Sequence, residues 1–337
     1  MTKERDCFLD FSKGLLIILV VLGHTIQYGS GAEFLESERY FDNWLMKYIY
    51  SFHMPMFIYI SGYFTGKSFL RKGRVRATAE RIKSLLIPIV SWVPIVAILE
   101  MLFGNAHISA KMIIRIFLTD FWFLWAVIIC TFYMYFSEMV PYAYRPIFHF
   151  LCALLSLLAP DILWLHAYKF MLPYFAFAFY LSQRKASYMI NKGLLWIPIF
   201  LLLLFLYSRE SYIYLSKFSI WGKFSNGIWI RQLGIDIYRY LIGFAGIASM
   251  LCLWKKIWKY VEPFKSFSFI ITWLGKNSVA IYILSTYIFV YLVPLLKDSK
   301  PVWYFWIVET VSVLAFCSAS TILLKKNRHI SRVIIGI

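Results

Sequence analysis

Residues 10–28 read DFSKGLLIILVVLGHTIQY, a polar head followed by a run that is apolar enough to be a membrane span. Lys13 and His24 lie eleven positions apart in this stretch. Because eleven residues make almost three helical turns, the two side chains would share one stripe of a helix, about 16 Å apart. An ionisable group at membrane depth is rare and functional by default. The stretch therefore predicts a membrane helix that carries chemistry.

The composition of the chain is typical of a membrane protein. Of its 337 residues, 61% are hydrophobic and 15% are charged, whereas soluble domains carry roughly a quarter charged residues. The formal net charge of +18 would in another chain suggest nucleic-acid binding, but here the basic residues lie in short loops between apolar stretches. Topology and lipid headgroups explain such residues. We therefore expect membrane lipid as a partner and no nucleic acid. The five cysteines show no metal-ligand spacing, so no metal is expected.

About ten apolar stretches are long enough to cross the hydrocarbon layer. They lie near residues 14–29, 48–66, 85–103, 116–136, 147–165, 168–182, 193–208, 233–254, 268–296 and 303–324. Lys and Arg favour, by roughly two to one, the loops that are cytoplasmic when the N-terminus is inside. The sequence thus predicts an all-α polytopic integral membrane protein of about ten transmembrane helices with both termini cytoplasmic. We expect one membrane-embedded domain over residues 1–337, with no appended extracytoplasmic domain.

A second histidine is expected to lie near His24. The second span begins with Ser51-Phe52-His53-Met54-Pro55, and because this helix enters from outside, His53 falls in the same outer half of the membrane as His24. A neutral imidazole can take a proton from a hydroxyl during acyl transfer. The structural alternative, that both histidines only serve helix packing, stays open. Asp10, three residues before Lys13, either holds that amine or caps the first helical turn.

Two further groups of charged residues are candidate binding groups. The loop from Lys67 to Lys83 is strongly basic, which keeps it cytoplasmic and suits anionic lipid. Its last cations, Arg81 and Lys83, could instead bind the phosphates of a nucleotide-like donor. Asp236 and Arg239 head the eighth span, where an unpaired charge is costly. They either neutralise each other, or Arg239 holds an acceptor or acyl-donor group.

The loop from Arg209 to Gln232 is predicted to lie outside and is rich in aromatic residues. These rings could stack on sugars, but the same mixture of aromatic and polar groups marks any membrane interface. The residues are Tyr212, Tyr214, Trp221 and Trp229.

The ordered motifs of the chain resemble those of the membrane-bound acyltransferase family 3. The chain has lysine rather than arginine ahead of the histidine, and in this motif it is most similar to the fucose 4-O-acetylase-like branch of that family. The motifs are Asp10-x-x-Lys13-Gly14 with His24, Ser51-Phe52-His53-Met54-Pro55-Met56-Phe57 with Ser61-Gly62, Trp122-Phe123-Leu124, and Leu274-Gly275-Lys276-Asn277-Ser278 with Tyr282.

The resemblance implies an enzyme that takes an acetyl or similar group from cytoplasmic acyl-CoA and delivers it to a sugar hydroxyl at or beyond the outer face. His24 matches the essential histidine of that family, and Lys13 matches the basic residue ahead of it. Arg81 matches the first arginine of a pair before the third span. Ser84 stands in place of the second arginine, which leaves the phosphate contact to Lys83 or Arg76.

These considerations give three predicted groups of site residues. The predicted catalytic group is His24, Lys13, Asp10 and His53. The predicted acyl-CoA-binding group is Lys13, Arg76, Arg81, Lys83, Ser61 and Gly62. The predicted acceptor-binding group is Asp236, Arg239, Trp122, Asn277, Ser278 and Tyr282. No bound cofactor is expected, since acetyl-CoA or another acyl-CoA serves as donor substrate.

The predicted function is that of an integral-membrane O-acyltransferase in the bacterial cytoplasmic (inner) membrane. Its expected acceptor is a surface polysaccharide, such as O-antigen, capsule or exopolysaccharide, or a lipid-linked precursor. A carrier or flippase for a polysaccharide intermediate is the alternative, and paired broken helices would favour it. The sequence shows one clear break, at Gly275 to Ser278. A non-catalytic subunit of a polysaccharide synthase is a weaker rival.

Overall fold

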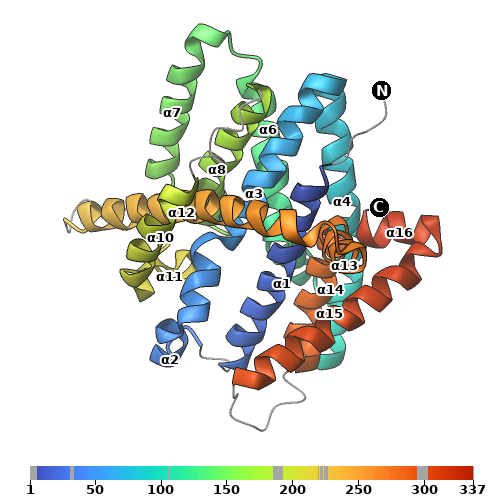
Figure 1. Cartoon of the computed structure of the whole chain (residues 1–337). Helices are drawn as coiled ribbons and strands as arrows, with labels where there is room; N and C mark the ends of the chain where they lie inside the picture. Colours follow the sequence, from blue (N-terminus) through green and yellow to red (C-terminus); the bar gives the residue numbers. More distant parts are fainter. Residues whose placement is uncertain are drawn as a thin grey trace. The chain divides into compact units, whose positions relative to one another are not determined.

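The computed structural model describes residues 6–30, 34–104, 107–184, 193–218, 220, 223, 227–293 and 303–336. These residues form helices joined by short loops and contain no strand (Figure 1). The all-α prediction is therefore confirmed. The α-helices are α1 (Cys7–Gly29), α2 (Glu38–Asp42), α3 (Trp44–Lys72), α4 (Arg74–Phe103), α5 (Ala110–Arg115), α6 (Trp122–Ser137), α7 (Arg145–Leu158), α8 (Leu165–Gln183), α10 (Trp196–Phe205), α11 (Ile213–Ser216), α12 (Trp229–Val261), α13 (Lys265–Lys276), α14 (Ser278–Tyr287), α15 (Trp303–Lys325) and α16 (Arg328–Ile335).

Several of these helices are suited to a membrane by length and composition. Among the described residues, four qualify: α1, α4, α12 and the part of α15 from Phe305 to Lys325. Two bent pairs raise the number to six, namely Ala110–Asp120 with Trp122–Ser137, bent by 66°, and Lys265–Lys276 with Ser278–Leu292, bent by 70°. Nine of the ten predicted apolar stretches lie mainly on one helix or on one of these pairs, whereas 147–165 runs past the end of α7 at Leu158 and through residues 159–164 to the first residue of α8. Residues 294–296 of the ninth stretch lie outside the described residues. The number of crossings and the side of the termini stay predictions.

The outer surface of the helices is apolar, as lipid contact requires. Helix α7 has no buried residue, and its Phe150 is 67% exposed. Leu102 on α4, Leu202 on α10 and Val308 on α15 are each more than 60% exposed. Exposed apolar surface on this scale would make a water-soluble protein aggregate. The chain is therefore a polytopic membrane protein.

The chain forms two compact units. Unit 1 comprises Met1–His53, Tyr188–Phe205 and Ala245–Ile337, and unit 2 comprises Met54–Ser187 and Leu206–Phe244. Two of the four boundaries fall inside α3 and inside α12, so each of these helices contributes to both units. The expectation of a single domain stays a prediction.

Two glycines bring α1 and α13 into direct backbone contact in unit 1. A Cβ atom on Gly14 would lie 1.9 Å from the Ile271 carbonyl oxygen, and one on Gly275 would lie 1.8 Å from the Asp10 carbonyl oxygen. Only residues without a side chain permit such an approach. The first and last of the sequence motifs therefore meet at one helix crossing.

In unit 2, α3 packs closely against α8 through a second pair of glycines. A Cβ atom on Gly62 would lie 2.3 Å from the Phe175 carbonyl oxygen, and one on Gly66 would lie 2.1 Å from Ser182 Oγ. Because the two glycines are four residues apart, they lie on the same face of α3. This crossing fixes the end of α3 that precedes Gly73, the single residue between α3 and α4. The basic stretch from Lys67 to Lys83, which was predicted to be a loop, is therefore helical on both sides of Gly73.

Candidate active site

His24 lies on α1 in unit 1, with its ring against other aromatic side chains. Its centroid is 5.8 Å from that of Phe289 and 6.3 Å from that of Tyr28, both edge to face. Tyr28 and Phe289 stack on each other at 5.7 Å. His24 Nδ1 is buried and has no hydrogen-bond partner within the described part of the chain. A ring nitrogen of this histidine is thus not engaged in holding the fold together.

His53 lies on α3 with its tautomer set by the backbone. Its Nδ1 is 2.7 Å from the Ile49 carbonyl oxygen. A carbonyl only accepts, so we infer that Nδ1 carries the proton and that Nε2 keeps its lone pair in the neutral ring. Tyr50, whose ring is 5.0 Å from that of His53, donates to Gln27 Oε1 on α1 at 2.7 Å.

The two histidines belong to one region of unit 1. They are close enough for an electrostatic interaction with each other. The hydrogen bond from Tyr50 on α3 to Gln27 on α1 lies about one helical turn from His24, because Gln27 is three residues after His24 in the chain. The structure thus brings His24 and His53 together, while their chemical roles stay predictions.

Lys13 and Asp10 form an ion pair at the start of α1. Lys13 Nζ lies 2.7 Å from Asp10 Oδ1, and the two side chains are 21% and 4% exposed. The helix is capped by Asp6 instead, whose side chain accepts from the Leu9 backbone N–H at 3.1 Å. Of the two possibilities for Asp10, the structure therefore supports the one in which it holds the amine.

The predicted acceptor residues Asn277, Ser278 and Tyr282 lie at the bend between α13 and α14. Asn277 is buried, its amide donates to the Trp273 carbonyl at 2.7 Å, and its Oδ1 accepts from Lys325 on α15. Ser278 begins α14 and is buried, and Tyr282 is half-buried. The side chain of Asn277 is thus engaged in joining helices. These three residues lie in unit 1, whereas Trp122, Asp236 and Arg239 lie in unit 2.

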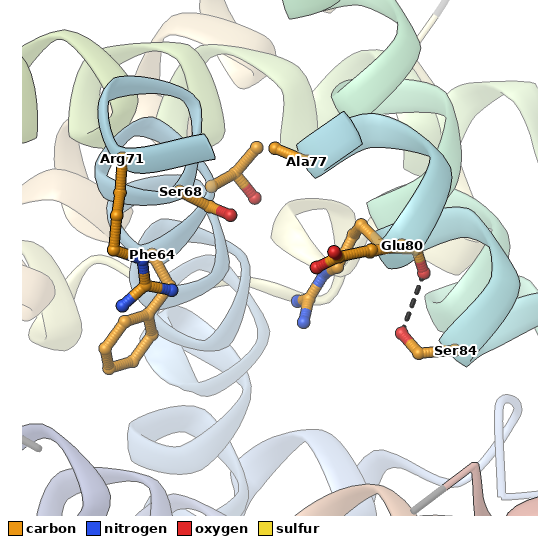
Figure 2. Close-up of a pocket in the computed structure, with 8 residues that line it drawn as sticks. Phe64, Ser68, Arg71, Ala77, Glu80 and Ser84 are labelled. Atoms are coloured by element: carbon orange, nitrogen blue, oxygen red, sulfur yellow. Dashed lines mark hydrogen bonds between the residues drawn. The ribbon is translucent and has the colours of Figure 1, made fainter. Parts of the chain in front are cut away.

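Unit 2 holds a pocket of about 270 Å³ between the end of α3 and the start of α4. Figure 2 shows Phe64, Ser68 and Arg71 on one wall and Glu80 and Ser84 on the other. Two arginines and several hydroxyls face the same space, a combination that suits phosphate oxygens. The lining residues are Phe64, Thr65, Ser68, Arg71, Ala77, Glu80, Arg81 and Ser84.

Arg81 is the predicted acyl-CoA-binding residue that the structure places in this pocket. Its Nε is buried and has no hydrogen-bond partner among the described residues. Ser84, on the next helical turn, donates from Oγ to the Arg81 carbonyl at 2.8 Å. Arg71, Ser68 and Thr65 were not predicted.

The other predicted acyl-CoA-binding residues of unit 2 do not line the described pocket. Arg76 Nε donates to Glu80 Oε1 at 3.0 Å, and Lys72 pairs with the same carboxylate. Lys83 is exposed. Gly62 faces Phe175 across the α3–α8 crossing, and the carbonyl of Ser61 accepts from the Thr65 hydroxyl at 2.8 Å.

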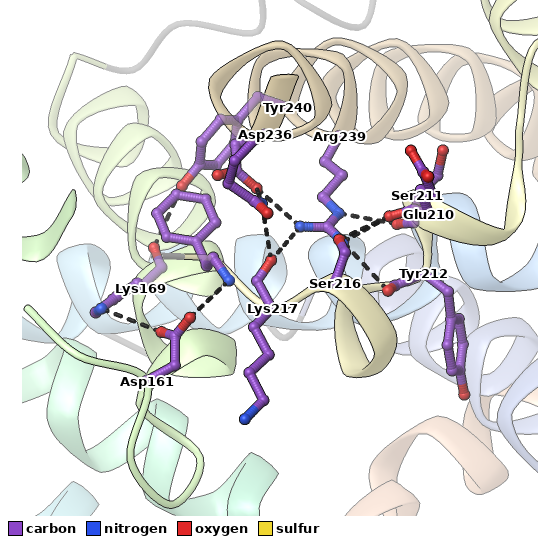
Figure 3. Close-up of polar contacts among 12 residues, drawn as sticks. Asp161, Lys169, Glu210, Ser211, Tyr212, Ser216, Lys217, Asp236, Arg239 and Tyr240 are labelled. Carbon is purple, nitrogen blue, oxygen red and sulfur yellow. Dashed lines mark hydrogen bonds and ion pairs between the residues drawn. The ribbon is translucent and has the colours of Figure 1, made fainter. Parts of the chain in front are cut away.

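Asp236 and Arg239 form a buried ion pair of 2.8 Å on α12 (Figure 3). All three nitrogens of the Arg239 guanidinium donate to protein oxygens. They reach the carbonyls of Glu210 and Ser211, both at 2.9 Å, the carbonyl of Tyr212 at 3.2 Å, the carbonyl of Lys217 and the hydroxyl of Ser216. Arg239 therefore organises residues 210–217, and the geometry agrees with the structural alternative for this pair. Trp221, of the predicted aromatic loop, lies outside the described residues.

Trp122 begins α6 and belongs to an aromatic group in unit 2. Its ring centroid is 5.9 Å from that of Trp164 and 5.9 Å from that of Tyr214. Trp122 was predicted from a motif, and Tyr214 from the aromatic loop. Trp164 was not predicted, because a single tryptophan near a span end carries no distinguishing signal.

Comparison with known proteins gives one family and a set of partial relatives. The chain matches the family described as "Acyltransferase domain" over residues 7–323. Over 134 residues it is 41% identical to the nodulation protein NolL of Sinorhizobium fredii, a segment that covers 37% of this chain and 35% of that protein. The nodulation protein NolL of Mesorhizobium japonicum is 34% identical over 134 residues, covering 38% and 35%. The match thus spans only 35% of the length of either relative. No solved structure matches the chain.

Proposed function

The chain belongs to the membrane-bound acyltransferase family 3, and from this premise we propose that it is an integral-membrane O-acyltransferase of the bacterial cytoplasmic membrane. Its donor is cytoplasmic acetyl-CoA. Its acceptor is a hydroxyl of a surface polysaccharide or of a lipid-linked precursor. The observation that carries the proposal is His24, an imidazole on a helix long enough to span the membrane, whose buried Nδ1 has no partner in the described part of the chain.

The chemistry follows from a neutral imidazole next to a hydroxyl and a thioester. His24 takes the proton of the sugar hydroxyl, whose oxygen attacks the acetyl carbonyl. The new C–O bond forms as the C–S bond breaks, and the proton passes from His24 to the CoA sulfur. A transient acetyl-histidine, from which the sugar then takes the acetyl group, is the second route. His53, with its Nε2 lone pair, supports proton transfer in either case.

The pocket in unit 2 supports a phosphate-bearing donor. The guanidinium groups of Arg71 and Arg81 can each hold phosphate oxygens through paired N–H donors. Ser68 adds a hydroxyl on the α3 wall, whereas the Ser84 hydroxyl on the α4 wall already donates to the Arg81 carbonyl. Its volume of about 270 Å³ suits the phosphate part of a CoA head group rather than the whole molecule.

The test is acetylation of the surface glycan, followed by mass spectrometry in cells that carry the wild-type chain or a variant. We expect His24→Ala to remove the mass increment of one acetyl group per acceptor. His107→Ala, an exposed histidine between α4 and α5, is the matched control and should keep it. Unchanged acetylation by a His24→Ala variant that is present at the normal amount would overturn the role of His24.

A carrier for a polysaccharide intermediate is the second candidate function, and one observation favours it. Both α5–α6 and α13–α14 are bent by more than 60° within an apolar pair, whereas the sequence pattern revealed only the second break. Broken helices are a feature of transporters. Release of CoA from acetyl-CoA by the purified chain, in the presence of a glycoside, would exclude a simple carrier. A carrier would leave the thioester intact.

A further inference from the structure

An aromatic cluster made of Trp122, Trp164 and Tyr214 lies beside His166 in unit 2 and contacts it through Trp164 and Tyr214. The two indole rings are 5.9 Å apart and tilted by 30°. Tyr214 stands nearly perpendicular to both, with its ring 5.9 Å from Trp122 and 5.6 Å from Trp164. The ring of His166 lies 5.5 Å from Trp164 and 6.4 Å from Tyr214. Each aromatic residue of the cluster is half-buried, whereas His166 is buried.

His166 is an unexplained polar group in this setting. It is 5% exposed, and neither of its ring nitrogens has a hydrogen-bond partner in the described part of the chain. Buried polar atoms in folded proteins are nearly always paired, because an unpaired one loses its hydration without compensation. A neutral imidazole offers one N–H donor and one acceptor nitrogen. A hydroxyl-bearing ligand could satisfy both atoms.

The segment that carries Trp164 and His166 is held in place by a buried ion pair. Asp161 receives Lys169 Nζ at 3.2 Å on one oxygen and the Phe218 backbone N–H at 3.0 Å on the other (Figure 3). Leu163, between Asp161 and Trp164, has a φ of +50°, a conformation that costs energy for a branched side chain. Such strain persists only where the surroundings impose it.

The segment that carries Tyr214 is held in the same manner. Arg239 binds the carbonyls of Ser211 and Tyr212 on one side of Tyr214 and that of Lys217 on the other. Lys217 has a φ of +58°, a second strained residue. Two buried ion pairs thus fix the two segments that carry Trp164, His166 and Tyr214, whereas an ordinary interfacial belt of aromatic residues needs no such framework.

We propose that the aromatic cluster and His166 form a carbohydrate-binding site, which takes the acceptor sugar of the proposed function. The apolar C–H face of a pyranose ring packs on the half-buried rings of Trp122 and Trp164. One hydroxyl of that sugar donates to His166, and another accepts from it. The identification of the bound sugar as the acyl acceptor rests on the proposed function. The existence of a sugar-binding site does not.

The chemistry of the lining favours a neutral sugar over other ligands. Every guanidinium nitrogen of Arg239 already donates to the protein, so this cation is not available for an anionic ligand. A lipid tail would cover the aromatic rings but leave both nitrogens of His166 unpaired. A sugar ring can pack its C–H face on the aromatic rings and form hydrogen bonds to the imidazole through its hydroxyls.

Binding can be measured without any acyl transfer, by saturation-transfer-difference NMR on the full chain in lipid nanodiscs. The probes are methyl α-L-fucopyranoside and methyl α-D-glucopyranoside. We expect saturation of the ring C–H protons of at least one glycoside with the wild-type chain. Trp164→Leu and His166→Phe should each weaken binding about tenfold or more, while His166→Gln, which keeps a donor and an acceptor, should retain part of it.

Trp196→Leu is the matched control, since Trp196 is 39% exposed on α10 and lies in unit 1. Binding that is equal in the wild-type chain and in Trp164→Leu would overturn the site, and so would the absence of saturation for both glycosides. Circular dichroism of each variant confirms that the helices are intact. A variant that is unfolded is replaced by Tyr214→Leu, to which the same expectation applies.

Release of CoA from acetyl-CoA separates this inference from the proposed function. Glycoside binding that is lost in Trp164→Leu, in a chain that never releases CoA, would sustain the site and reject the enzyme. Acyl transfer with an unchanged glycoside KM in Trp164→Leu would sustain the enzyme and reject the site.

Discussion

His166 and Ser182 lie near the two ends of helix α8, about 24 Å apart along its axis. His166 belongs to the proposed carbohydrate site. Ser182 packs against Gly66, and the neighbouring Thr65 lines the arginine-containing pocket. The two candidate sites of unit 2 thus lie at opposite ends of α8, as separate sites for a donor and an acceptor require.

The close crossing of α1 and α13 predicts that a side chain added at Gly14 or Gly275 destabilises the protein. Gly14→Ala and Gly275→Ala each place a methyl group within 2 Å of a backbone carbonyl oxygen of the partner helix. We expect each to destabilise the protein by about 1–3 kcal/mol or more, because a backbone cannot move aside as a side chain can. Thermal unfolding in detergent measures the effect.

Gly234→Ala is the matched control for these two variants. Gly234 lies on α12, and a Cβ atom there would meet nothing within 4 Å. Alanine is the better helix former, so the variant should be as stable as the wild type or gain up to about 1 kcal/mol. Equal melting temperatures for all three variants would contradict the close crossing.

The Arg239 network predicts a loss of stability rather than a loss of affinity. Arg239→Gln leaves the buried Asp236 carboxylate without its cation and releases the carbonyls of residues 210–212. Breaking a buried pair in this way costs about 3–5 kcal/mol. We expect a lower melting temperature and faster proteolysis after residue 209.

Arg231→Gln is the control for that experiment. Arg231 is 68% exposed and pairs with Glu210 at the surface, so its loss should cost about 1 kcal/mol or less. A folded Arg239→Gln variant that melts normally but shows a raised acceptor KM would instead assign Arg239 to acceptor binding.

The helices of this fold could be predicted because a membrane imposes apolar runs that are visible residue by residue. The break at Gly275 to Ser278 was visible for the same reason, since polar residues interrupt the run and the structure bends there by 70°. The pairing of Asp10 with Lys13 was one of the two alternatives that their spacing of three allowed, and the structure supports it. Local patterns of this kind need no knowledge of the tertiary structure.

Features that depend on distant partners could not be predicted. Gly14 and Gly275 each appeared in a motif, but nothing in either motif states that they touch. Arg71 could not be distinguished from its basic neighbours, because the pocket is defined by how α3 meets α4. His166 was one of several histidines near span ends. Its significance depends on its contact with Tyr214, which lies almost fifty residues further along the chain.

The pocket in unit 2 predicts a specific loss of donor affinity. Arg81→Gln removes a guanidinium whose buried Nε has no partner among the described residues. We expect the KM for acetyl-CoA to rise roughly tenfold or more, because charge-assisted hydrogen bonds to phosphate are lost. Lys83→Gln, an exposed residue that does not line the pocket, should change the KM little. Equal effects of the two variants would point to general electrostatic attraction instead.

The Ser84→Arg variant should have the opposite effect at the same pocket, a higher affinity for acetyl-CoA. Ser84 lines the pocket and donates only to the Arg81 carbonyl, so its replacement adds a third arginine at little structural cost. The KM for acetyl-CoA should fall, and the fall should be smaller at high salt because added ions screen the new charge. A KM that is unchanged at low salt would show that the phosphates of the donor do not reach this wall.

The hydrogen bond from His53 to Ile49 allows its structural and chemical roles to be separated. His53→Asn keeps a donor near the position of Nδ1 and removes Nε2, whereas His53→Gln places an amide near the position of Nε2 and gives up the bond to the Ile49 carbonyl. If Nε2 takes part in proton transfer, His53→Asn should fold normally and lose about 100-fold or more in kcat. If the residue only holds α3 in shape, His53→Asn should be active and His53→Gln should melt at a lower temperature. Measuring kcat and the melting temperature of both variants decides between the two, because only the catalytic role predicts a large loss of kcat in a His53→Asn variant that melts normally.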